Sequence, residues 1–163
     1  EGGHVMYMPT PQDVVDRMLE LAEVSKEDLV YDLGCGDGRV LVTAASTYGC
    51  RCRGYDIDPV RVRESLENAR QHDVDQLVEV EQKDIFTLDL RDADVIFLYL
   101  LPKLNIRLIP QFEQLKPGTR IVSHLFDMQG VQPDTVLRID SAEDGFEHEI
   151  YLWTTPLKFA DEE

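Results

Sequence analysis

The sequence is poor in positive charge. Its 16 Lys and Arg residues stand against 32 Asp and Glu residues, which leaves a formal net charge of −16 at pH 7. Proteins that bind nucleic acids need basic surfaces to displace the counterions of the phosphate backbone. The acidity therefore disfavours DNA or RNA as a partner and is compatible with a cationic ligand or a basic protein.

Long apolar stretches are missing as well. The longest run covers residues 95–101, whereas a membrane-spanning helix needs about 20 apolar residues. We therefore expect no membrane span, and no secretory apolar segment is visible. The chain begins with Glu1 rather than Met, which leaves open a removed upstream targeting segment.

Cysteine is scarce, and the three present, Cys35, Cys50 and Cys52, are odd in number. Cys50 and Cys52 lie two positions apart on one expected strand, a poor geometry for a disulfide. This favours a reducing compartment, so we expect a cytoplasmic protein. Neither cysteines nor histidines show metal-ligand spacing, and we expect no bound metal.

The length of 163 residues suits one domain over residues 1–163. Short apolar runs alternate with helical patterns along it. Thr10 is expected to cap the first helix, with Pro11 at its first position, and Asp58 to cap the third. Expected strands cover residues 29–33, 51–57, 77–82, 94–100, 120–126, 136–139 and 149–154. Expected helices follow Thr10, cover 39–47, follow Asp58, and cover 104–115 with a break near Pro110.

This order of elements predicts an α/β fold. Strands that alternate with helices form a parallel sheet with helices on both faces, and the two late strands form a closing hairpin. We expect a doubly wound, mostly parallel seven-stranded sheet with an antiparallel C-terminal edge. The acidic turn at residues 140–149, in that hairpin, is expected to be solvated.

A glycine-rich loop, residues 34–38, follows the first strand. In open α/β sheets ligands bind at the carboxyl ends of the strands, where glycines let the backbone approach them closely. Asp56 ends the second strand, about 20 residues further on, where an acid typically binds ribose hydroxyls. Asp84 follows the third strand and could accept from an adenine amino group. Each acid alone could be a turn residue, but together they describe a nucleoside slot.

The loop does not suit a dinucleotide. The dinucleotide fingerprint places a third glycine five positions after the first, and here Arg39 occupies that place. Asp32 and Asp37 would each cost roughly 3 kcal/mol at about 6 Å from a pyrophosphate charge. The same acids favour a ligand with an ammonium and a sulfonium group, such as S-adenosylmethionine.

Three segments resemble motifs of the class I (seven-strand) S-adenosylmethionine-dependent methyltransferases: residues 30–38, residues 54–58 and Asp84-Ile85. The resemblance extends over nearly the whole chain. It implies a Rossmann-like fold, with the methionine part of the cofactor near the glycine loop, the ribose at Asp56 and the adenine at Asp84. The residues it implies for cofactor binding are Asp32, Gly34, Cys35, Gly36, Asp56, Ile57, Asp84 and Ile85. Tyr7 and Thr10 join them from an N-terminal segment, residues 1–10, that would cover the cofactor.

Three further segments are similar to small single-domain relatives of mitochondrial protein-lysine methyltransferases: residues 7–11, 98–102 and 123–127. The Asn/Asp-Pro-Pro-Tyr motif of enzymes that methylate DNA bases and glutamine is absent. The resemblance implies N-methylation of a lysine amine in a protein. A small-molecule methyltransferase and a non-catalytic S-adenosylmethionine-binding module remain alternatives, and the oligomeric state is open.

A methyltransferase mainly positions the nucleophile and controls its protonation. A lysine amine must lose its proton first, which a slot of low dielectric favours. Tyr99, after the fourth strand, is the candidate catalytic residue that orients the acceptor, and an aromatic packed at the sheet edge is the alternative. His124 could line the acceptor pocket or be a hydrogen-bonded histidine at the sheet edge. No general base stands out.

Overall fold

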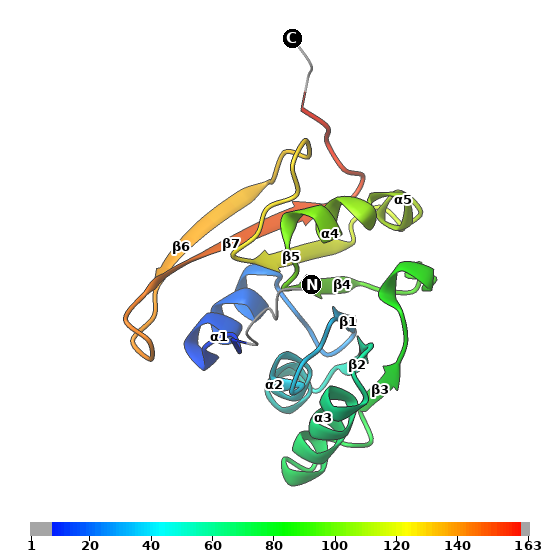
Figure 1. The fold of residues 1–163 in the computed structure, drawn as a ribbon, viewed down its shortest axis with the longest axis vertical. Helices are drawn as coiled ribbons and strands as arrows, with labels where there is room; N and C mark the ends of the chain where they lie inside the picture. The colour runs from blue at the N-terminus through cyan, green and yellow to red at the C-terminus, as the bar shows by residue number, and fades with distance from the viewer. Residues whose placement is uncertain (1–7, 161–163) are drawn as a thin grey trace, which may run out of the picture.

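The computed structural model describes residues 8–160, which form one seven-stranded sheet with helices on both faces (Figure 1). The strands are β1 (Leu29–Leu33), β2 (Arg51–Asp56), β3 (Val78–Gln82), β4 (Val95–Leu98), β5 (Arg120–His124), β6 (Thr135–Asp140) and β7 (Glu147–Thr154). The helices are α1 (Gln12–Leu21), α2 (Arg39–Tyr48), α3 (Pro59–Gln71), the short 3-10 helix η1 (Ile85–Thr87), α4 (Pro102–Arg107) and α5 (Ile109–Phe112).

The strand order is β3-β2-β1-β4-β5-β7-β6. Strands β1 to β5 are parallel, β7 runs antiparallel to β5, and β6 runs antiparallel to β7. This confirms the predicted fold class, including its antiparallel C-terminal edge. The chain leaves β1 toward β3 and then returns to β4 on the other side of β1, so the strand order reverses there. A crevice at such a reversal is the usual ligand site of a doubly wound sheet.

The core lies in two layers because successive residues of a strand point to opposite faces. On β4, Val95 and Phe97 pack with the layer under α1, α2 and α3, while Ile96 and Leu98 pack with the layer under α4 and α5. All four side chains are buried. β4 is therefore apolar throughout, as a central parallel strand requires.

β4 and β5, the two parallel strands beyond the reversal, end earlier than expected. β4 stops at Leu98 and β5 at His124, so Tyr99 and Leu125 lie in the loops that follow. The break expected near Pro110 is present, because α4 ends at Arg107 and α5 begins at Ile109. These shortened strands leave the loops free to shape the crevice.

The prediction that Thr10 caps the first helix is wrong. α1 begins at Gln12, and Pro11 holds the capping position without a side-chain bond. The free N–H groups of Gln12 and Asp13 donate instead to the carboxylate of Glu143, at 2.9 and 3.1 Å. Glu143 lies in the acidic β6–β7 turn, so that turn is exposed but not merely solvated: it caps α1.

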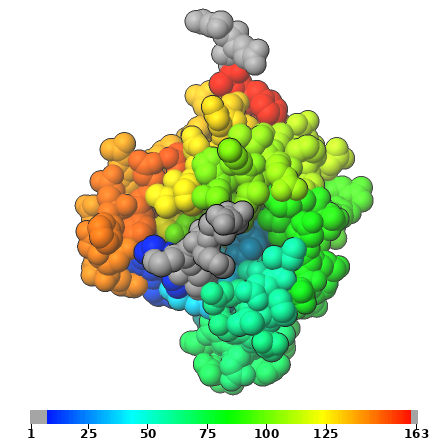
Figure 2. All heavy atoms as spheres, viewed as in Figure 1, coloured from blue at the N-terminus to red at the C-terminus, as the bar shows by residue number. Residues whose placement is uncertain are grey.

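The β6–β7 hairpin and α3 lie at different sides of the molecule. Figure 2 shows the hairpin in orange on one side and α3 in blue-green at the bottom. Within residues 8–160, no helix has the length and apolar character needed to cross a membrane.

Candidate functional site

The carboxyl ends of the first parallel strands surround a pocket of about 710 Å³. Most of the residues expected to bind the cofactor line it: Gly34, Gly36, Asp56, Ile57, Asp84 and Ile85. Tyr99 lines it as well. A smaller cavity of about 40 Å³ adjoins it through Gly34, Gly36 and Tyr99, and is also lined by Thr10, Asp32 and Cys35. The structure therefore brings these predicted residues into one region at the carboxyl ends of the strands.

The glycine loop is held in its shape before any ligand binds. The N–H groups of Gly34 and Cys35 donate to the carbonyl of Tyr55 on β2, at 2.8 and 3.0 Å. Ser65 on α3 donates its hydroxyl to the carbonyl of Gly36 at 2.7 Å. At Gly38 φ is +82°, and a Cβ there would lie 2.9 Å from Ser65. Only glycine fits this position.

Ser65 and Asn68 are supports of the loop that the sequence reading missed. Asn68 donates to the carbonyl of Asp37 at 3.2 Å, and Ser65 is completely buried. Both lie on the side of α3 that faces the glycine loop. A polar residue among apolar positions on a buried helix face was the available signal.

Two hydrogen bonds from backbone N–H groups hold the carboxylate of Asp56 in its orientation. One oxygen accepts from the N–H of Gly36 at 3.1 Å and the other from Asp58 at 3.0 Å. Each oxygen has a second lone pair, so the group can still accept from two hydroxyls. Asp84 is exposed and caps η1 by accepting from Phe86 at 3.0 Å, which leaves its other oxygen for a ligand.

Asp32 is the buried acid of the site, at 6% exposure. Burial raises its pKa to about 8, and the charges of Asp56 and Asp37 add to the rise. The carboxyl therefore keeps its proton at neutral pH in the ligand-free protein. A cation in the adjoining cavity would favour the ionised form, because opposite charges stabilise each other most strongly where water is excluded.

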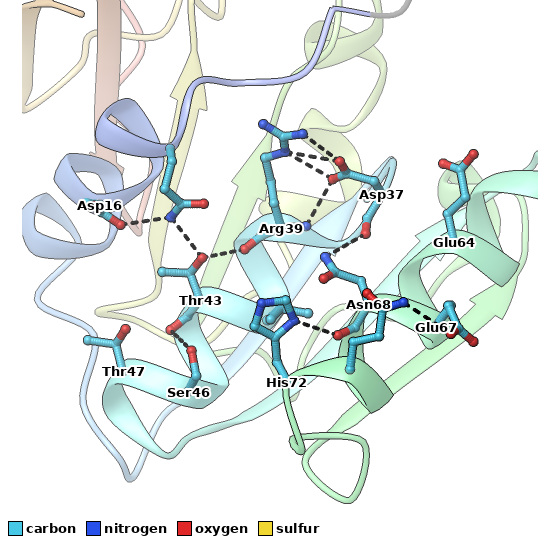
Figure 3. A pocket seen from close by; sticks show the side chains of 13 residues that line it. Asp16, Asp37, Arg39, Thr43, Ser46, Thr47, Glu64, Glu67, Asn68 and His72 are labelled. Atoms are coloured by element: carbon cyan, nitrogen blue, oxygen red, sulfur yellow. Dashed lines mark hydrogen bonds and ion pairs between the residues drawn. The ribbon is translucent and has the colours of Figure 1, made fainter. Parts of the chain in front are cut away.

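A second hollow, about 810 Å³, lies on the helical face between α1, α2 and α3 (Figure 3). Of the predicted cofactor-binding residues that the structure describes, none lines it. Several of its polar side chains are already hydrogen-bonded: Gln12 donates to the hydroxyl of Thr43 at 3.0 Å, and Nδ1 of His72 bonds the backbone carbonyl of Asn68 at 2.9 Å. We therefore assign the candidate site to the strand ends rather than to this groove.

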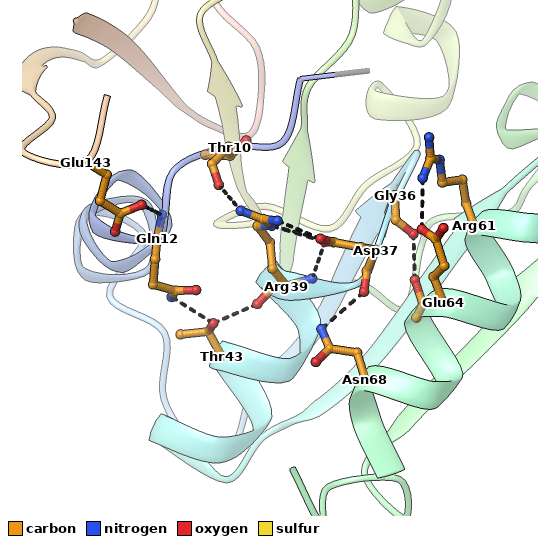
Figure 4. Close-up of polar contacts among 11 residues, drawn as sticks. Thr10, Gln12, Gly36, Asp37, Arg39, Thr43, Arg61, Glu64, Asn68 and Glu143 are labelled. Carbon is orange, nitrogen blue, oxygen red and sulfur yellow. Dashed lines mark hydrogen bonds and ion pairs between the residues drawn. The ribbon is translucent and has the colours of Figure 1, made fainter. Parts of the chain in front are cut away.

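Asp37 does not act as a free acid in the slot. Arg39 binds it with Nη2 at 2.6 Å and Nε at 3.1 Å, and also donates to the carbonyl of Thr10 at 2.8 Å (Figure 4). Burial alone would raise the pKa of Asp37, but the hydrogen bonds and charge of Arg39 outweigh it and hold that pKa below its usual range. The expectation that Asp37 faces a cationic ligand is wrong, because its carboxylate is paired with Arg39.

Tyr99, which lines both cavities, lies against His124. Their ring centroids are 4.4 Å apart, and Phe126 stacks on Tyr99 at 6.1 Å. Burial raises the pKa of Tyr99, so its hydroxyl stays protonated. Burial, reinforced by the neighbouring His148, lowers the pKa of His124 to about 4. His124 is hydrogen-bonded, as one reading expected, but β5 is an interior strand and not an edge.

The remaining predicted residues are placed as follows. Tyr7 lies outside the described residues. Cys35 is buried, and burial raises the pKa of its thiol, so the group is a poor nucleophile. Cys50 and Cys52 are free and buried. Among residues 8–160 there is no group of three or more His, Cys, Asp or Glu side chains that could hold a metal ion.

Comparison with known proteins decides the family. Residues 32–135 match the model of the ANTKMT methyltransferase domain. This range contains the glycine loop and the three strand-end acids Asp32, Asp56 and Asp84. The chain belongs to this methyltransferase family. It is also 43% identical to a protein-lysine N-methyltransferase of Saccharolobus islandicus over 92% of this chain and 93% of that protein.

Structural comparison agrees with this family. The crystal structure of an RNA methyltransferase from Salinibacter ruber with S-adenosyl-L-homocysteine matches with a TM-score of 0.85 and 46% identity. The match covers 95% of this chain and 98% of that one. A ribosomal protein L11 methyltransferase of Oceanobacillus iheyensis is 30% identical over 60% of this chain and 31% of its own length. The methyltransferase is therefore an enzyme with the predicted class I fold.

Proposed function

We propose that this methyltransferase uses S-adenosylmethionine to N-methylate a lysine amine of a protein acceptor. One observation carries the proposal: acids at three strand ends line two adjoining cavities that share Tyr99, and apolar side chains beside Tyr99 line the mouth of the wider cavity. A cationic nucleoside fits against the acids, and an amine on an aliphatic stem fits the apolar mouth.

The residues of the slot suit each part of the cofactor. A positive charge beside Asp32 would favour its ionised form. This fits the end of the cofactor that carries the ammonium and sulfonium groups. Asp56 has free lone pairs for the ribose hydroxyls, and Asp84 for the adenine amino group. Ile57, 70% exposed, and the buried Ile85 supply apolar walls for the adenine ring.

When bound, the cofactor supplies an electrophilic methyl group on its sulfonium. Tyr99, protonated at neutral pH, can orient the acceptor amine through its hydroxyl. Leu101, Leu125 and Phe126 line the mouth and exclude water from the amine. A drier environment lowers the pKa of an amine, which favours the uncharged form that attacks.

The choice of a protein acceptor rests on similarity and charge. The relative from Saccharolobus islandicus is a protein-lysine N-methyltransferase. The Salinibacter ruber relative is called an RNA methyltransferase, but a net charge of −16 opposes association with phosphate and favours a lysine-rich protein. The three free cysteines support the cytoplasmic location expected from the sequence.

The test is incubation of the protein with methyl-labelled S-adenosylmethionine and a cell lysate, followed by separation of protein, RNA and small molecules. We expect label in protein, recovered as methyl-lysine after hydrolysis. Label confined to RNA or to small molecules would contradict the proposed acceptor. Cofactor binding without any transfer would favour the non-catalytic alternative.

A further inference from the structure

A chain of hydrogen-bonded side chains connects the β6–β7 hairpin to the inner end of the site. Asp144 Oδ2 lies 2.7 Å from Nε2 of His148, and Nδ1 of His148 lies 2.8 Å from Nε2 of His124. Nδ1 of His124 lies 2.9 Å from the hydroxyl oxygen of Thr10. The chain joins three separate segments: the hairpin, β5 and the residues before α1.

When His148 is neutral, the direction of every bond in the chain follows from its outer end. A backbone bond from Phe146 and the bond with His148 hold the pKa of Asp144 below its usual value, so it is a carboxylate that only accepts. His148 must then donate from Nε2 and, when neutral, accept at Nδ1. His124 must in turn donate from Nε2 and accept at Nδ1. The low pKa of His124 keeps that ring neutral, as this arrangement requires.

The consequence falls on Thr10. Its hydroxyl proton is committed to His124, so only oxygen lone pairs remain for a ligand in the cavity that it shares with Asp32 and Tyr99. The backbone around it is held too, because Arg39 binds its carbonyl and Glu143 caps the helix that follows. Thr10 is thus a fixed acceptor in a region that is otherwise rich in acids.

We propose that Asp144, His148 and His124 are positioning residues that keep the Thr10 hydroxyl oxygen ready to accept a hydrogen bond from a cationic N–H group of the ligand. This inference rests on the proposed function. The N–H group belongs either to the ammonium of the cofactor or to the acceptor amine. The chemistry is the same in both cases, and binding measurements separate the two sources.

The experiment compares a ligand that has the amino-acid end of the cofactor with one that lacks it. S-adenosylhomocysteine carries this end with its ammonium, and 5′-methylthioadenosine has the same thioether nucleoside without it. Dissociation constants are measured by calorimetry for the wild type, Thr10→Val, His148→Phe and Thr10→Ser, which keeps the hydroxyl. Asp140→Asn is the matched control, because it removes one negative charge from the same hairpin outside the chain.

If Thr10 accepts from the cofactor, Thr10→Val and His148→Phe should raise the dissociation constant of S-adenosylhomocysteine about tenfold. The dissociation constant of 5′-methylthioadenosine should not change. If Thr10 accepts from the acceptor amine, both constants should stay the same while the acceptor KM rises and the cofactor KM does not. Thr10→Ser and Asp140→Asn should resemble the wild type in either case. Normal binding and normal acceptor KM in folded Thr10→Val and His148→Phe would overturn the proposal.

A second readout needs no variant. Nitrogen chemical shifts of the wild-type histidines report which ring nitrogen carries the proton, and we expect Nε2 in both His124 and His148. The opposite tautomer in either ring would overturn the proposal even if a variant failed to fold. Absence of S-adenosylhomocysteine binding by the wild type would instead contradict the proposed function, so the two failures are distinguishable.

Discussion

At the scale of single residues, Asp32 couples the cofactor to protons. It is a buried carboxyl with a pKa raised to about 8, first by burial and then by the nearby Asp56 and Asp37. A cationic ligand beside it favours the ionised form. Binding near neutral pH must therefore expel the proton that the free protein holds.

We predict that binding of S-adenosylhomocysteine at pH 7 releases about one proton and tightens as pH rises from about 6 to 8. Calorimetry in buffers of different ionisation enthalpy measures the number of protons directly. Asp32→Asn should bind more weakly, with no proton release and no such pH dependence. Release of no proton by the wild type would contradict this coupling between binding and the ionisation of Asp32.

The raised pKa of Asp32 also makes the free energy of unfolding depend on pH. The folded protein holds a proton on Asp32 that the unfolded chain, with a pKa near 3.8, gives up. The stabilising contribution is fully present below about pH 4 and is lost as pH rises through about 8. Asp32→Asn should therefore gain stability over the wild type from pH 5 to 8, by at most about 1.4 kcal/mol per pH unit. Urea unfolding across this range measures it, and a constant difference would contradict the raised pKa.

Leu125, which lines the wider pocket, has a strained backbone. Its φ is +70°, the N–H of Phe126 donates to the carbonyl of His124 across it at 2.8 Å, and its side chain is 41% exposed. A turn of this kind is rare and costs of order 1–3 kcal/mol, and such strain tends to persist at functional sites. It holds Leu125 at the mouth of the pocket.

We predict that Leu125→Gly is more stable than Leu125→Ala by about 1 kcal/mol, the reverse of the usual order, because only glycine relieves the positive φ. Both variants should raise the acceptor KM and leave the cofactor KM unchanged. Chemical unfolding and steady-state kinetics check the two parts. Equal acceptor KM in both variants and the wild type would mean that the side chain serves no acceptor.

At the scale of elements, the sequence predicted what depends on local pattern. β1 has its expected bounds, and the acids at the carboxyl ends of β1, β2 and β3 lie together because parallel strands end at the same edge of the sheet. Contacts between segments that are far apart in the sequence could not be predicted from local pattern. Glu143 caps a helix that begins 131 residues earlier, and His124 bonds Thr10 across 114 residues. Neither partner can be read from spacing.

The cap of α1 makes a prediction at this scale. Glu143→Ala should lower the free energy of unfolding by about 1 kcal/mol, because two N–H groups lose their acceptor and the positive helix end loses an anion. Glu143→Gln should lose less. Glu147→Ala on the same hairpin is the control and should change stability by less than about 0.5 kcal/mol. Urea unfolding checks all three, and equal loss in Glu143→Ala and Glu147→Ala would contradict the cap.

At the scale of the whole molecule, the charge of −16 divides into two parts. A few acids, Asp32, Asp56 and Asp84, line the slot, while Asp37 is paired with Arg39. The other acids give the surface a negative field that attracts basic partners over about a Debye length. The composition alone indicated the sign of the partner but not this division, which depends on the folded chain.

We predict that the KM for a lysine-rich protein acceptor rises about tenfold between roughly 0.05 and 0.5 M salt, because the surface field is screened. The dissociation constant of the uncharged 5′-methylthioadenosine should not change, which makes it the internal control. Steady-state kinetics at several salt concentrations give the slope. An acceptor KM independent of salt would mean that the surface charge does not guide the acceptor.

The most direct test of a lysine methyltransferase built on these strand-end acids is transfer of a labelled methyl group to a lysine-rich protein, compared between the wild type and Asp56→Ala. The wild type should place label on lysine Nζ, identified by mass spectrometry of the product. Asp56→Ala should lose at least about tenfold in transfer at limiting cofactor, because the ribose loses its acceptor. Label on any other atom, or equal transfer by Asp56→Ala, would contradict the proposed site.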